Sequence, residues 1–336
     1  MEMLLERQVL DMQLKNKKHM IIMVSGASGI VGYGILRSLS ELDCILIGTT
    51  IYDESPADCF SDIVLKAPLT TDKNYLSWLK DTIRNYKIDM IIPAIEADMS
   101  LWNEYRTELE KEGTFVLLNN SSLIELCLDK WKFYEKLESS GLRYFIKSSI
   151  TPSFSTFEIP FILKPRCGFG SKGIVKVHSY DDYKNYEEEI GKNLMMQEYV
   201  GTDDEEYSIS AFFDVESNLK ACIALKRKLS KQGYTEMAEV VFLDGIKGVL
   251  VELAQVFKPI GPTNFQFRKV GECWKLLEIN PRISSSTSIR KAFGYNESKM
   301  CVDYFLNGQE ILQPEIKKGK SMRYIEDFIF YDSNNI

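Results

Sequence analysis

The sequence predicts a two-part protein, in which an α/β domain with a parallel sheet is followed by an α+β region. In the first 120 residues, apolar strands such as MIIMV (20–24) and CILIG (44–48) alternate with helical stretches. This alternation is typical of a parallel, doubly wound sheet. After residue 140, strand patterns follow one another across glycine-containing turns, as in hairpins.

Composition and charge limit the classes of function. The chain has 336 residues, with 45% hydrophobic and 26% charged residues, which is typical of a folded globular protein of two or three domains. Its net charge of -7 argues against nucleic acid or an anionic membrane as the main partner. No stretch approaches the ~18 uninterrupted apolar residues of a membrane-spanning helix.

Cysteine and histidine are used sparingly. The seven cysteines are scattered without a C-x-x-C pair, which favours reduced thiols and a cytoplasmic location over disulfides or zinc. The only histidines are His19 and His178, so a mechanism built on histidine is disfavoured. Phosphoryl transfer depends instead on positioning and charge neutralisation, and it is compatible with this composition.

A glycine turn follows the first strand. In GASGIVGYG (26–34), Gly26, Gly29 and Gly32 have the strand–glycine–helix context that lets a backbone approach a phosphate. The turn resembles the opening of the short-chain dehydrogenases and epimerases, which keeps an NAD(P)-dependent nucleotide-sugar epimerase or reductase as an alternative. Against it, the second strand ends in threonines and Asp53 comes late, in a loop. The Tyr-x-x-x-Lys matches also lack a supporting Ser.

The rest of the first 120 residues continues the alternation. The predicted elements are a helix at 35–42, a helix at 74–86, a strand at 87–99, a helix at 101–113 and a strand at 114–120. Glu96 and Asp98 come at the end of one strand, where α/β sheets bind ligands, although acids in a surface loop are equally common.

The next segment combines a helix with a glycine loop. A helix from Leu123 to Ser140, capped by Ser121 or Ser122, is predicted to end at Gly141. The strand PFILKPR (160–166) then leads into the loop CGFGSKGI (167–174) and a second strand. The loop lacks the Gly-Lys-Ser/Thr ending of a Walker A sequence, but a glycine turn of this kind can fold over phosphates.

The most informative pattern is a hairpin of TNFQFRK (263–269) and LLEINPR (276–282). Side chains of a strand alternate between faces, so polar groups share one face and apolar groups, including Leu277 and Ile279, the other. The polar face carries Asn264, Gln266, Arg268, Glu278, Asn280 and Arg282. Pairing Gln266 opposite Glu278 keeps these groups together. Their oxygens suit magnesium, and the guanidinium of Arg282 suits a phosphate.

Three other features carry weaker predictions. The run Lys226-Arg227-Lys228 ends a strand and favours surface charge over contact with phosphate or a substrate carboxylate. Arg290 could bind an anion or lie along the surface. The tail after Pro314 becomes strand-like at 323–332.

Taken in order, these features resemble the ATP-grasp superfamily from about residue 20 to residue 312. The members most similar are those of the carbamoyl-phosphate synthetase large-subunit type, which include carboxylate–amine ligases such as amino-acid ligases and the pyrrolysine-biosynthesis ligase. The resemblance implies a Rossmann-like domain without a nicotinamide role, followed by a two-subdomain ATP-grasp fold. The implied organisation is an N-terminal extension at 1–19, a Rossmann-like domain at 20–120, a first ATP-grasp subdomain with the glycine flap at 121–197, a second with the metal site at 198–312, and a tail at 313–336.

The resemblance also implies site residues. The nucleotide would be held by Lys130, Lys164, Gly168, Phe169, Gly170, Ser171, Gly173, Glu198, Tyr199, Val200 and Glu206. In this set Lys130 is the first nucleotide-binding lysine, and Lys164 is the second, which contacts ATP phosphate and the adenine edge. Glu198 and the backbone of Tyr199 and Val200 would contact the adenine, and Glu206 would accept the ribose hydroxyls. Arg282 and Lys172 would be catalytic, and Gln266, Glu278 and Asn280 would bind magnesium.

The implied activity is an ATP- and Mg²⁺-dependent, ADP-forming carboxylate–amine ligase that acts through an acyl phosphate. Its partners would be small-molecule carboxylates and amines, without nucleic acid or membrane, and a homodimer stays open. Carboxyphosphate chemistry and a non-catalytic ATP-binding module remain as alternatives. The linker at 142–152 is longer than is usual in the family, and the SSSTS run (284–288) lacks a common glycine, so the acceptor geometry is the least defined part.

Overall fold

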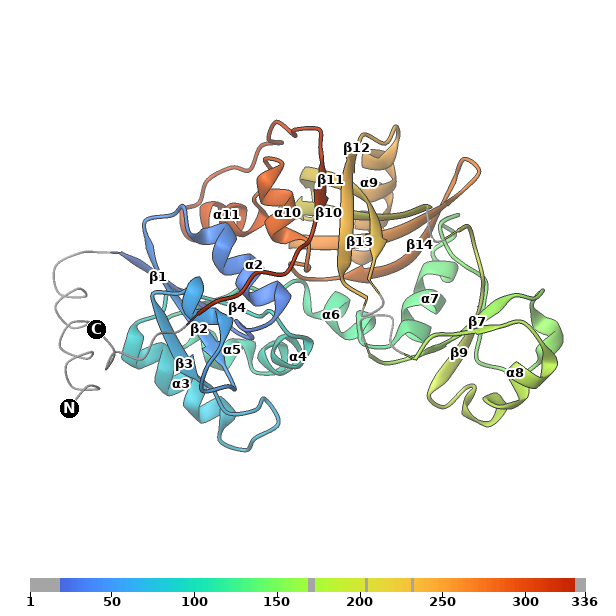
Figure 1. Ribbon diagram of the computed structural model, residues 1–336, viewed down its shortest axis with the longest axis horizontal. Coiled ribbons are helices and arrows are strands. Elements are labelled where there is room, and N and C mark those ends of the chain that lie inside the picture. Colours follow the sequence, from blue (N-terminus) through green and yellow to red (C-terminus); the bar gives the residue numbers. More distant parts are fainter. Residues whose placement is uncertain (1–18, 169–172, 203–204, 231–232, 330–336) are drawn as a thin grey trace. The chain divides into compact units, whose positions relative to one another are not determined.

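The computed structural model describes residues 19–168, 173–202, 205–230 and 233–329. The chain divides into two compact units, Met1–Leu117 with Phe305–Asn307, and Leu118–Tyr304 with Gly308–Ile336 (Figure 1). Residues 1–18 of the predicted N-terminal extension lie outside the described residues. The finer domain bounds given above stay predictions.

The first unit contains a five-stranded parallel sheet in the order β3-β2-β1-β4-β5, which agrees with the predicted α/β class. The strands are β1 (Met20–Val24), β2 (Cys44–Thr50), β3 (Ile63–Lys66), β4 (Met90–Ile92) and β5 (Phe115–Val116). The helices are α2 (Ile30–Leu39), α3 (Tyr75–Tyr86), α4 (Glu96–Glu104) and α5 (Arg106–Glu110), with a 3-10 turn η1 (Pro56–Cys59). The central strand β1 is buried from Ile21 onward, because strands inside a parallel sheet are covered on both faces.

Close backbone packing explains the glycine turn after β1. Gly26 has a φ of +57°, a left-handed conformation that glycine adopts without steric cost. A Cβ on Gly32 would lie 2.3 Å from the Gly26 carbonyl oxygen and 2.7 Å from the Ala27 Cα. The spacing of these glycines therefore has a structural reason that requires no nicotinamide nucleotide.

Gly32→Ala is expected to destabilise the first unit by about 1–3 kcal/mol, because the new methyl group would force the turn away from α2. Gly248→Ala, in α9 (Ile246–Phe257) of the second unit, is the matched control, since a Cβ there meets nothing within 4 Å. It should raise the stability of its own unit by up to about 1 kcal/mol through helix propensity. Urea unfolding and scanning calorimetry would measure the stability changes of both variants. Equal stability of Gly32→Ala and the wild type would contradict the packing argument.

The second unit contains two antiparallel sheets. The four-stranded sheet has the order β6-β9-β7-β8, and the six-stranded sheet has the order β14-β13-β10-β11-β12-β15. The smaller sheet comprises β6 (Ser148–Ser149), β7 (Phe161–Pro165), β8 (Val175–Val177) and β9 (Leu194–Glu198). The larger comprises β10 (Glu206–Phe213), β11 (Leu219–Leu229), β12 (Thr235–Val241), β13 (Gly261–Val270), β14 (Cys273–Asn280) and β15 (Lys320–Met322). The remaining elements are α6 (Ser121–Cys127), α7 (Lys130–Ser139), η2 (Phe154–Thr156), α8 (Tyr180–Lys184), η3 (Glu187–Glu189), α9, α10 (Thr287–Ala292) and α11 (Glu297–Cys301), and a π-helix, η5 (Val302–Leu306), follows α11.

Each sheet of the second unit has its own apolar core. The larger core joins α6, α7 and α9 to one face of the six-stranded sheet, and it includes Phe133, Leu253, Phe265 and Phe267. A smaller core lies under the four-stranded sheet around Phe161. Because one face of the six-stranded sheet is taken up by this core, its other face is left for the polar residues described below.

The long helix predicted at 123–140 is two helices, α6 and α7, and the sequence-based prediction was wrong on this point. Asp129 separates them: its Oδ1 accepts from the Trp131 N–H at 2.9 Å and caps α7, while its Oδ2 binds Arg166 Nη2 at 2.6 Å. The cap of α6 is Asn120, in place of the predicted Ser121 or Ser122. Gly141 follows α7 with a φ of +73°, as expected of a helix end.

The strand predicted at 323–332 is absent over its described residues, so this prediction was wrong there. β15 occupies Lys320–Met322 and pairs antiparallel with β12, and residues 323–329 form no strand. Residues 330–332 of the predicted strand lie outside the described residues.

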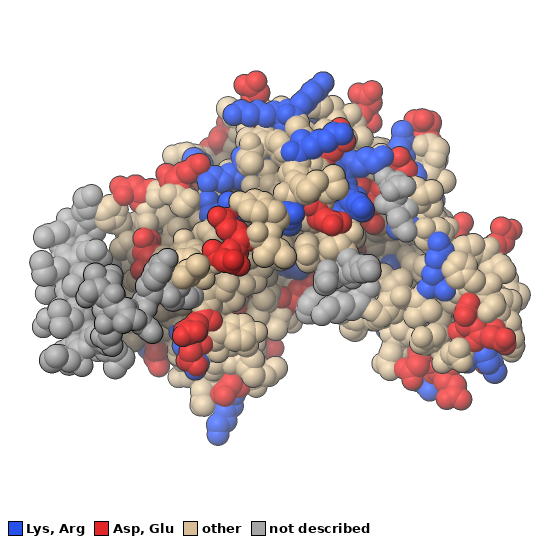
Figure 2. Space-filling model, in the orientation of Figure 1, with Lys and Arg blue, Asp and Glu red and all other residues tan. Residues whose placement is uncertain are grey.

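On the face shown in Figure 2, acidic and basic side chains are interspersed. Over the residues that the structure describes, every helix is too short or too polar to cross a bilayer.

Candidate active site

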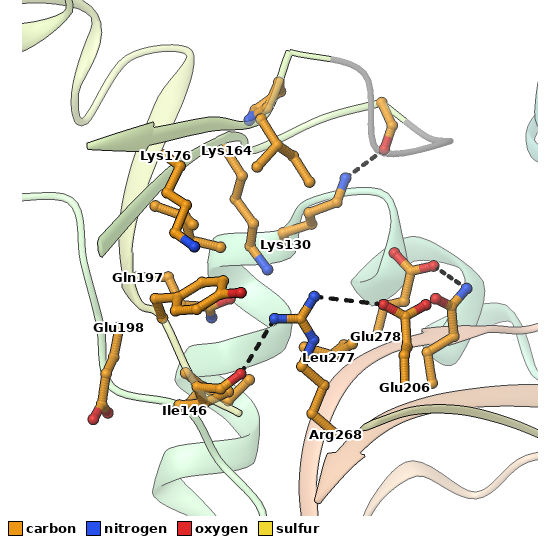
Figure 3. Close-up of a pocket in the computed structure, with 17 residues that line it drawn as sticks. Lys130, Ile146, Lys164, Lys176, Gln197, Glu198, Glu206, Arg268, Leu277 and Glu278 are labelled. Atoms are coloured by element: carbon orange, nitrogen blue, oxygen red, sulfur yellow. Dashed lines mark hydrogen bonds and ion pairs between the residues drawn. The ribbon is translucent and has the colours of Figure 1, made fainter. Parts of the chain in front are cut away.

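A cavity of about 260 Å³ lies between the two sheets of the second unit (Figure 3). One wall comes from α7, β7, β8 and β9, and the other from β10, β13 and β14. The lining residues are Lys130, Ile146, Ile162, Lys164, Pro165, Gly168, Ile174, Lys176, Gln197, Glu198, Tyr199, Val200, Glu206, Gln266, Arg268, Leu277 and Glu278. Cations, carboxylates and apolar side chains therefore meet in one cavity.

Lys164, on β7, points into the middle of the cavity (Figure 3) and is only 6% exposed. Its Nζ donates to the Tyr134 hydroxyl at 3.1 Å and lies 4.3 Å from the centre of the Tyr134 ring. Burial lowers the pKa of Lys164 from 10.5 to about 7, and the negative charge of Glu278 opposes this effect only in part. An anion in the cavity would favour the charged form of this lysine.

Two further lysines converge on the same space. Lys130 is the first residue of α7, and its Nζ donates to the Gly168 carbonyl oxygen at the start of the glycine loop. Its backbone N–H donates to the Arg166 carbonyl at 2.8 Å, which holds the start of the helix against the end of β7. Lys176 Nζ, on β8, lies 3.7 Å from the centre of the Tyr199 ring. The arrangement suits a ligand with several negative charges.

The predicted hairpin has the predicted register. Gln266 of β13 pairs with Glu278 of β14, and Asn264 pairs with Asn280. Glu278 Oε1 accepts from Gln266 Nε2 at 2.5 Å and from Asn280 Nδ2 at 2.9 Å. Among the described residues no donor reaches Oε2 of Glu278. A carboxylate oxygen left without a donor beside an amide is a donor set that fits Mg²⁺, which takes few protein ligands together with phosphate and water oxygens.

A β-bulge changes the apolar side of this hairpin. Phe267 pairs with Leu276 while Gln266 pairs with Glu278, so Leu277 is an extra residue on β14. Leu276 and Ile279 lie in the core, whereas Leu277 is partly buried, packs against the core and also lines the cavity. The predicted core position of Leu277 therefore holds only in part, because simple alternation does not anticipate a bulge.

A buried ionic cluster joins Glu206 to Glu278. Arg227 Nη2 donates to Glu206 Oε1 at 2.8 Å and to Gln266 Oε1 at 2.5 Å, and Arg268 Nη2 lies 3.7 Å from Glu206 Oε2. Gln266 is thus held at both ends of its amide, by Arg227 at the oxygen and by Glu278 at the nitrogen. These ion pairs and hydrogen bonds offset part of the desolvation free energy of the buried charges.

The remaining wall is apolar and lies beside the segment 197–200. Ile146, Ile162, Ile174, Val200 and Leu277 supply flat aliphatic surface. The Glu198 side chain points away from Lys164 (Figure 3). An apolar slot next to exposed backbone, with cations at its far end, would accept a planar ring that carries a charged tail.

Sequence comparisons match three family models. An ATP-grasp domain model matches residues 127–243, and a model described as ATP-grasp in the biosynthetic pathway with Ter operon matches residues 191–328. A model of the PylC-like N-terminal domain matches residues 38–117. The two ATP-grasp models together run from residue 127 to residue 328, which includes both sheets and the cavity. Residues 127–328 of the chain are therefore similar to ATP-grasp domains.

Two curated proteins are similar to about half of the chain. A formate-dependent phosphoribosylglycinamide formyltransferase of Prochlorococcus marinus is 28% identical over 189 residues, covering 52% of this chain and 46% of the relative. The chain thus spans about half the length of the curated relatives that it matches.

Solved structures show the same fold at low identity. N5-carboxyaminoimidazole synthetase from Staphylococcus aureus in complex with ADP gives a TM-score of 0.71 at 17% identity, covering 90% of this chain and 81% of that one. The biotin carboxylase domain of Hydrogenobacter thermophilus 2-oxoglutarate carboxylase, with MgADP and bicarbonate, gives 0.72 at 15% identity, with coverages of 90% and 74%. L-amino acid ligase from Bacillus licheniformis gives 0.65 at 16% identity, with coverages of 86% and 74%. The predicted fold, a Rossmann-like domain followed by an ATP-grasp fold, is confirmed.

The structure brings most of the predicted ATP-grasp site residues to the cavity. Those that line it are Lys130, Lys164, Gly168, Glu198, Tyr199, Val200, Glu206, Gln266 and Glu278. Asn280 binds Glu278 without lining the cavity, and Arg282 follows β14 with its Nη1 donating to the Ile283 carbonyl at 3.1 Å. Gly173, near the end of the glycine loop, has a φ of +76°. Phe169, Gly170, Ser171 and Lys172 lie outside the described residues. The roles of all these residues stay predictions.

Sequence reasoning missed Lys176, which lines the cavity and which alternation along β8 could have indicated. Arg268, which alternation placed on the polar face of the hairpin without a role in the site, also lines the cavity. Arg227 is 8% exposed, so the surface interpretation of that residue was wrong. Arg290 is fully buried and bound to Glu297, which excludes a position along the surface.

Proposed function

We propose that the protein is an ATP- and Mg²⁺-dependent, ADP-forming ligase that joins a carboxylate to an amine through an acyl phosphate. The observation that carries the proposal is the buried Lys164, which faces the carboxylate of Glu278 across a cavity between the two ATP-grasp sheets. Among the residues that the structure describes, no carboxylate is within hydrogen-bonding distance of the buried Lys164 ammonium, which favours an anionic ligand. A triphosphate matches the added charges of Lys130, Lys176 and Arg268.

In this proposal the phosphates lie among Lys130, Lys164 and Lys176, beneath the glycine loop, and the adenine lies in the apolar slot beside Tyr199 and Val200. Glu206, Glu198 and the flap residues Gly168, Phe169, Gly170, Ser171 and Gly173 complete the nucleotide site. Glu278 and Asn280 offer oxygens to magnesium, and Gln266 either joins them or orients Glu278. Magnesium, when bound with ATP, neutralises charge on the phosphates.

The proposed reaction has two steps. A carboxylate oxygen of the first substrate attacks the γ-phosphorus of ATP, and ADP leaves. The amine then attacks the acyl carbon, and inorganic phosphate leaves with the bonding electrons. A free carboxylate is a poor electrophile, so activation is needed before the amine can react. Lys164, Lys172 and Arg282 would stabilise the negative charge on the transferring phosphoryl group.

We propose small-molecule carboxylates and amines as substrates, by analogy with the L-amino acid ligase neighbour, and formate is the carboxylate named for the curated relatives. A cytoplasmic location suits a protein whose described cysteines are all free. A homodimer is also proposed, and light scattering of the purified protein would test it.

ATP with Mg²⁺ is expected to raise the melting temperature, whereas NAD(P) should leave it unchanged. At a ligand concentration of ~100 Kd the stabilisation would be about 2.7 kcal/mol, because only the folded chain binds. ADP release during a screen of carboxylates against amines then tests turnover. Stabilisation by NAD(P) without ATP would favour the epimerase alternative, and ATP binding without ADP release on any pair would favour a non-catalytic module.

Carboxyphosphate chemistry is the second candidate, because one similar structure contains bicarbonate together with MgADP. In that case bicarbonate would take the place of the carboxylate substrate. ADP release that depends on bicarbonate, in the absence of any other carboxylate, would favour this candidate over the proposed ligase.

A further inference from the structure

The phenol of Tyr134 connects the two sheets that enclose the cavity. Tyr134 lies on α7, is 2% exposed and does not itself line the cavity. Its hydroxyl accepts a hydrogen bond from Lys164 Nζ of the four-stranded sheet at 3.1 Å. The same hydroxyl donates to the Leu277 carbonyl oxygen of the six-stranded sheet, and it lies 3.4 Å from the Leu276 carbonyl oxygen.

The carbonyl that receives this bond belongs to the β-bulge. Because Gln266 pairs with Glu278 and Phe267 with Leu276, Leu277 has no cross-strand partner on β13. β14 is also an edge strand, and on its outer side the Leu276 N–H donates to the Tyr144 carbonyl at 2.8 Å. The Tyr134 hydroxyl therefore supplies an anchor directly before Glu278 that the sheet itself does not provide.

We propose that Tyr134 is a positioning residue, whose one hydroxyl binds both the Lys164 ammonium and the carbonyl of Leu277, the residue before Glu278, and so sets the spacing between the ammonium and the Glu278 carboxylate. The proposal rests on the proposed function for what is positioned, namely a phosphate-binding cation and a magnesium-binding carboxylate. A hydroxyl suits this role because it accepts one hydrogen bond and donates another. Burial raises the pKa of Tyr134, so the group stays protonated and keeps its donor.

A purely structural role for the ring is the competing explanation. The Tyr134 ring packs edge-on against Phe133 at 5.1 Å within the larger core. Tyr134→Phe separates the two explanations, since it keeps the ring and removes only the hydroxyl. Tyr144→Phe is the matched control, because Tyr144 lies in the same core, is equally buried and loses a hydroxyl bond to Glu252, which does not line the cavity. The substitution keeps the backbone bond from the Leu276 N–H to the Tyr144 carbonyl.

The first measurement needs no nucleotide. Hydrogen exchange of the free protein, read from peptides covering residues 276–280, is expected to be on the order of tenfold faster in Tyr134→Phe and unchanged in Tyr144→Phe, since one buried hydrogen bond is lost at the bulge. Equal exchange in Tyr134→Phe and the wild type would overturn the proposal, whatever the activity of the protein.

The second measurement is a double-mutant cycle on ATP binding in the presence of Mg²⁺. Tyr134→Phe should weaken binding on the order of tenfold and raise the Mg²⁺ concentration at half-saturation, while Tyr144→Phe changes neither. In a Lys164→Met background the further loss in ATP affinity should be much smaller, because the lysine that the hydroxyl positions is gone. Fully additive losses would overturn the proposal. If the wild type binds no ATP, the proposed function fails, and the exchange result alone decides the role of Tyr134.

Discussion

Glu278→Gln is expected to slow ADP formation on the order of 10²-fold or more, the loss typical of removing one preorganised electrostatic group. The substitution keeps the size and shape of the side chain and removes the negative charge. In the structure Glu278 Oε1 accepts from the amides of both Gln266 and Asn280, and the charge of the carboxylate also acts on Lys164. Steady-state ADP release with the best substrate pair measures the effect.

The control for this prediction lies on the same hairpin. Glu272, in the turn between β13 and β14, has a side chain that is 95% exposed, so Glu272→Gln removes the same charge at the surface. It should leave turnover and Mg²⁺ dependence unchanged, whereas Glu278→Gln should also raise the Mg²⁺ concentration at half-saturation. A Glu278→Gln protein that releases ADP at the wild-type rate would contradict the placement of magnesium at this hairpin.

The hairpin was predictable because two local rules determine it. Strand side chains alternate with a period of two, and the Gly271-Glu272 turn fixes which residues face each other, so Gln266 opposite Glu278 followed from sequence alone. The bulge at Leu277 was not predictable in this way. It is stabilised by the Tyr134 hydroxyl, which comes from a helix more than 140 residues earlier in the chain.

Arg227 shows where a local interpretation fails. In a run of three cations the expected position is the surface, and Lys226 does pair with Glu205 in a half-exposed position. Arg227 is buried because β11 pairs with the central strand β10, which places Glu206 and Gln266 within hydrogen-bonding distance. Sheet order therefore decided its environment, and sheet order is a non-local property that the spacing of charges does not reveal.

Asp129 is a local signal for the break between α6 and α7. Aspartate is a favoured helix cap, but Asp129 stands inside a continuous helical pattern, and the choice between cap and interior depended on Arg166. That ion pair also brings Lys130 to the cavity, because Lys130 is the residue after the cap. The same contact thus determines a secondary-structure boundary and a site residue.

Lys164→Met is expected to weaken ATP binding on the order of 10- to 100-fold, as for the loss of a charged hydrogen bond to phosphate. Lys164 lies in the middle of the cavity, and methionine retains most of its aliphatic volume. Titration calorimetry with ATP and Mg²⁺ measures the loss. Lys136→Met, on the exposed face of the same helix as Lys130, is the control and should bind normally.

Lys164→Met should also stabilise the nucleotide-free protein, by an amount that depends on pH. Burial lowers the pKa of Lys164 from 10.5 in the unfolded chain to about 7 in the folded one, so between these values the unfolded chain binds the additional proton. The stability of the wild type must then rise with pH from about 7 toward 10.5, and below pH 7 it carries the full cost of a buried ammonium. Lys164→Met lacks this slope, so its advantage over the wild type in urea unfolding should be largest below pH 7 and shrink as the pH rises. An advantage that is independent of pH would mean that the lysine is not desolvated. Burial disfavours the charged form of Lys164 in the ligand-free protein. Lys164 is therefore suited to bind an anion, because the negative charge of a bound phosphate would stabilise the ammonium.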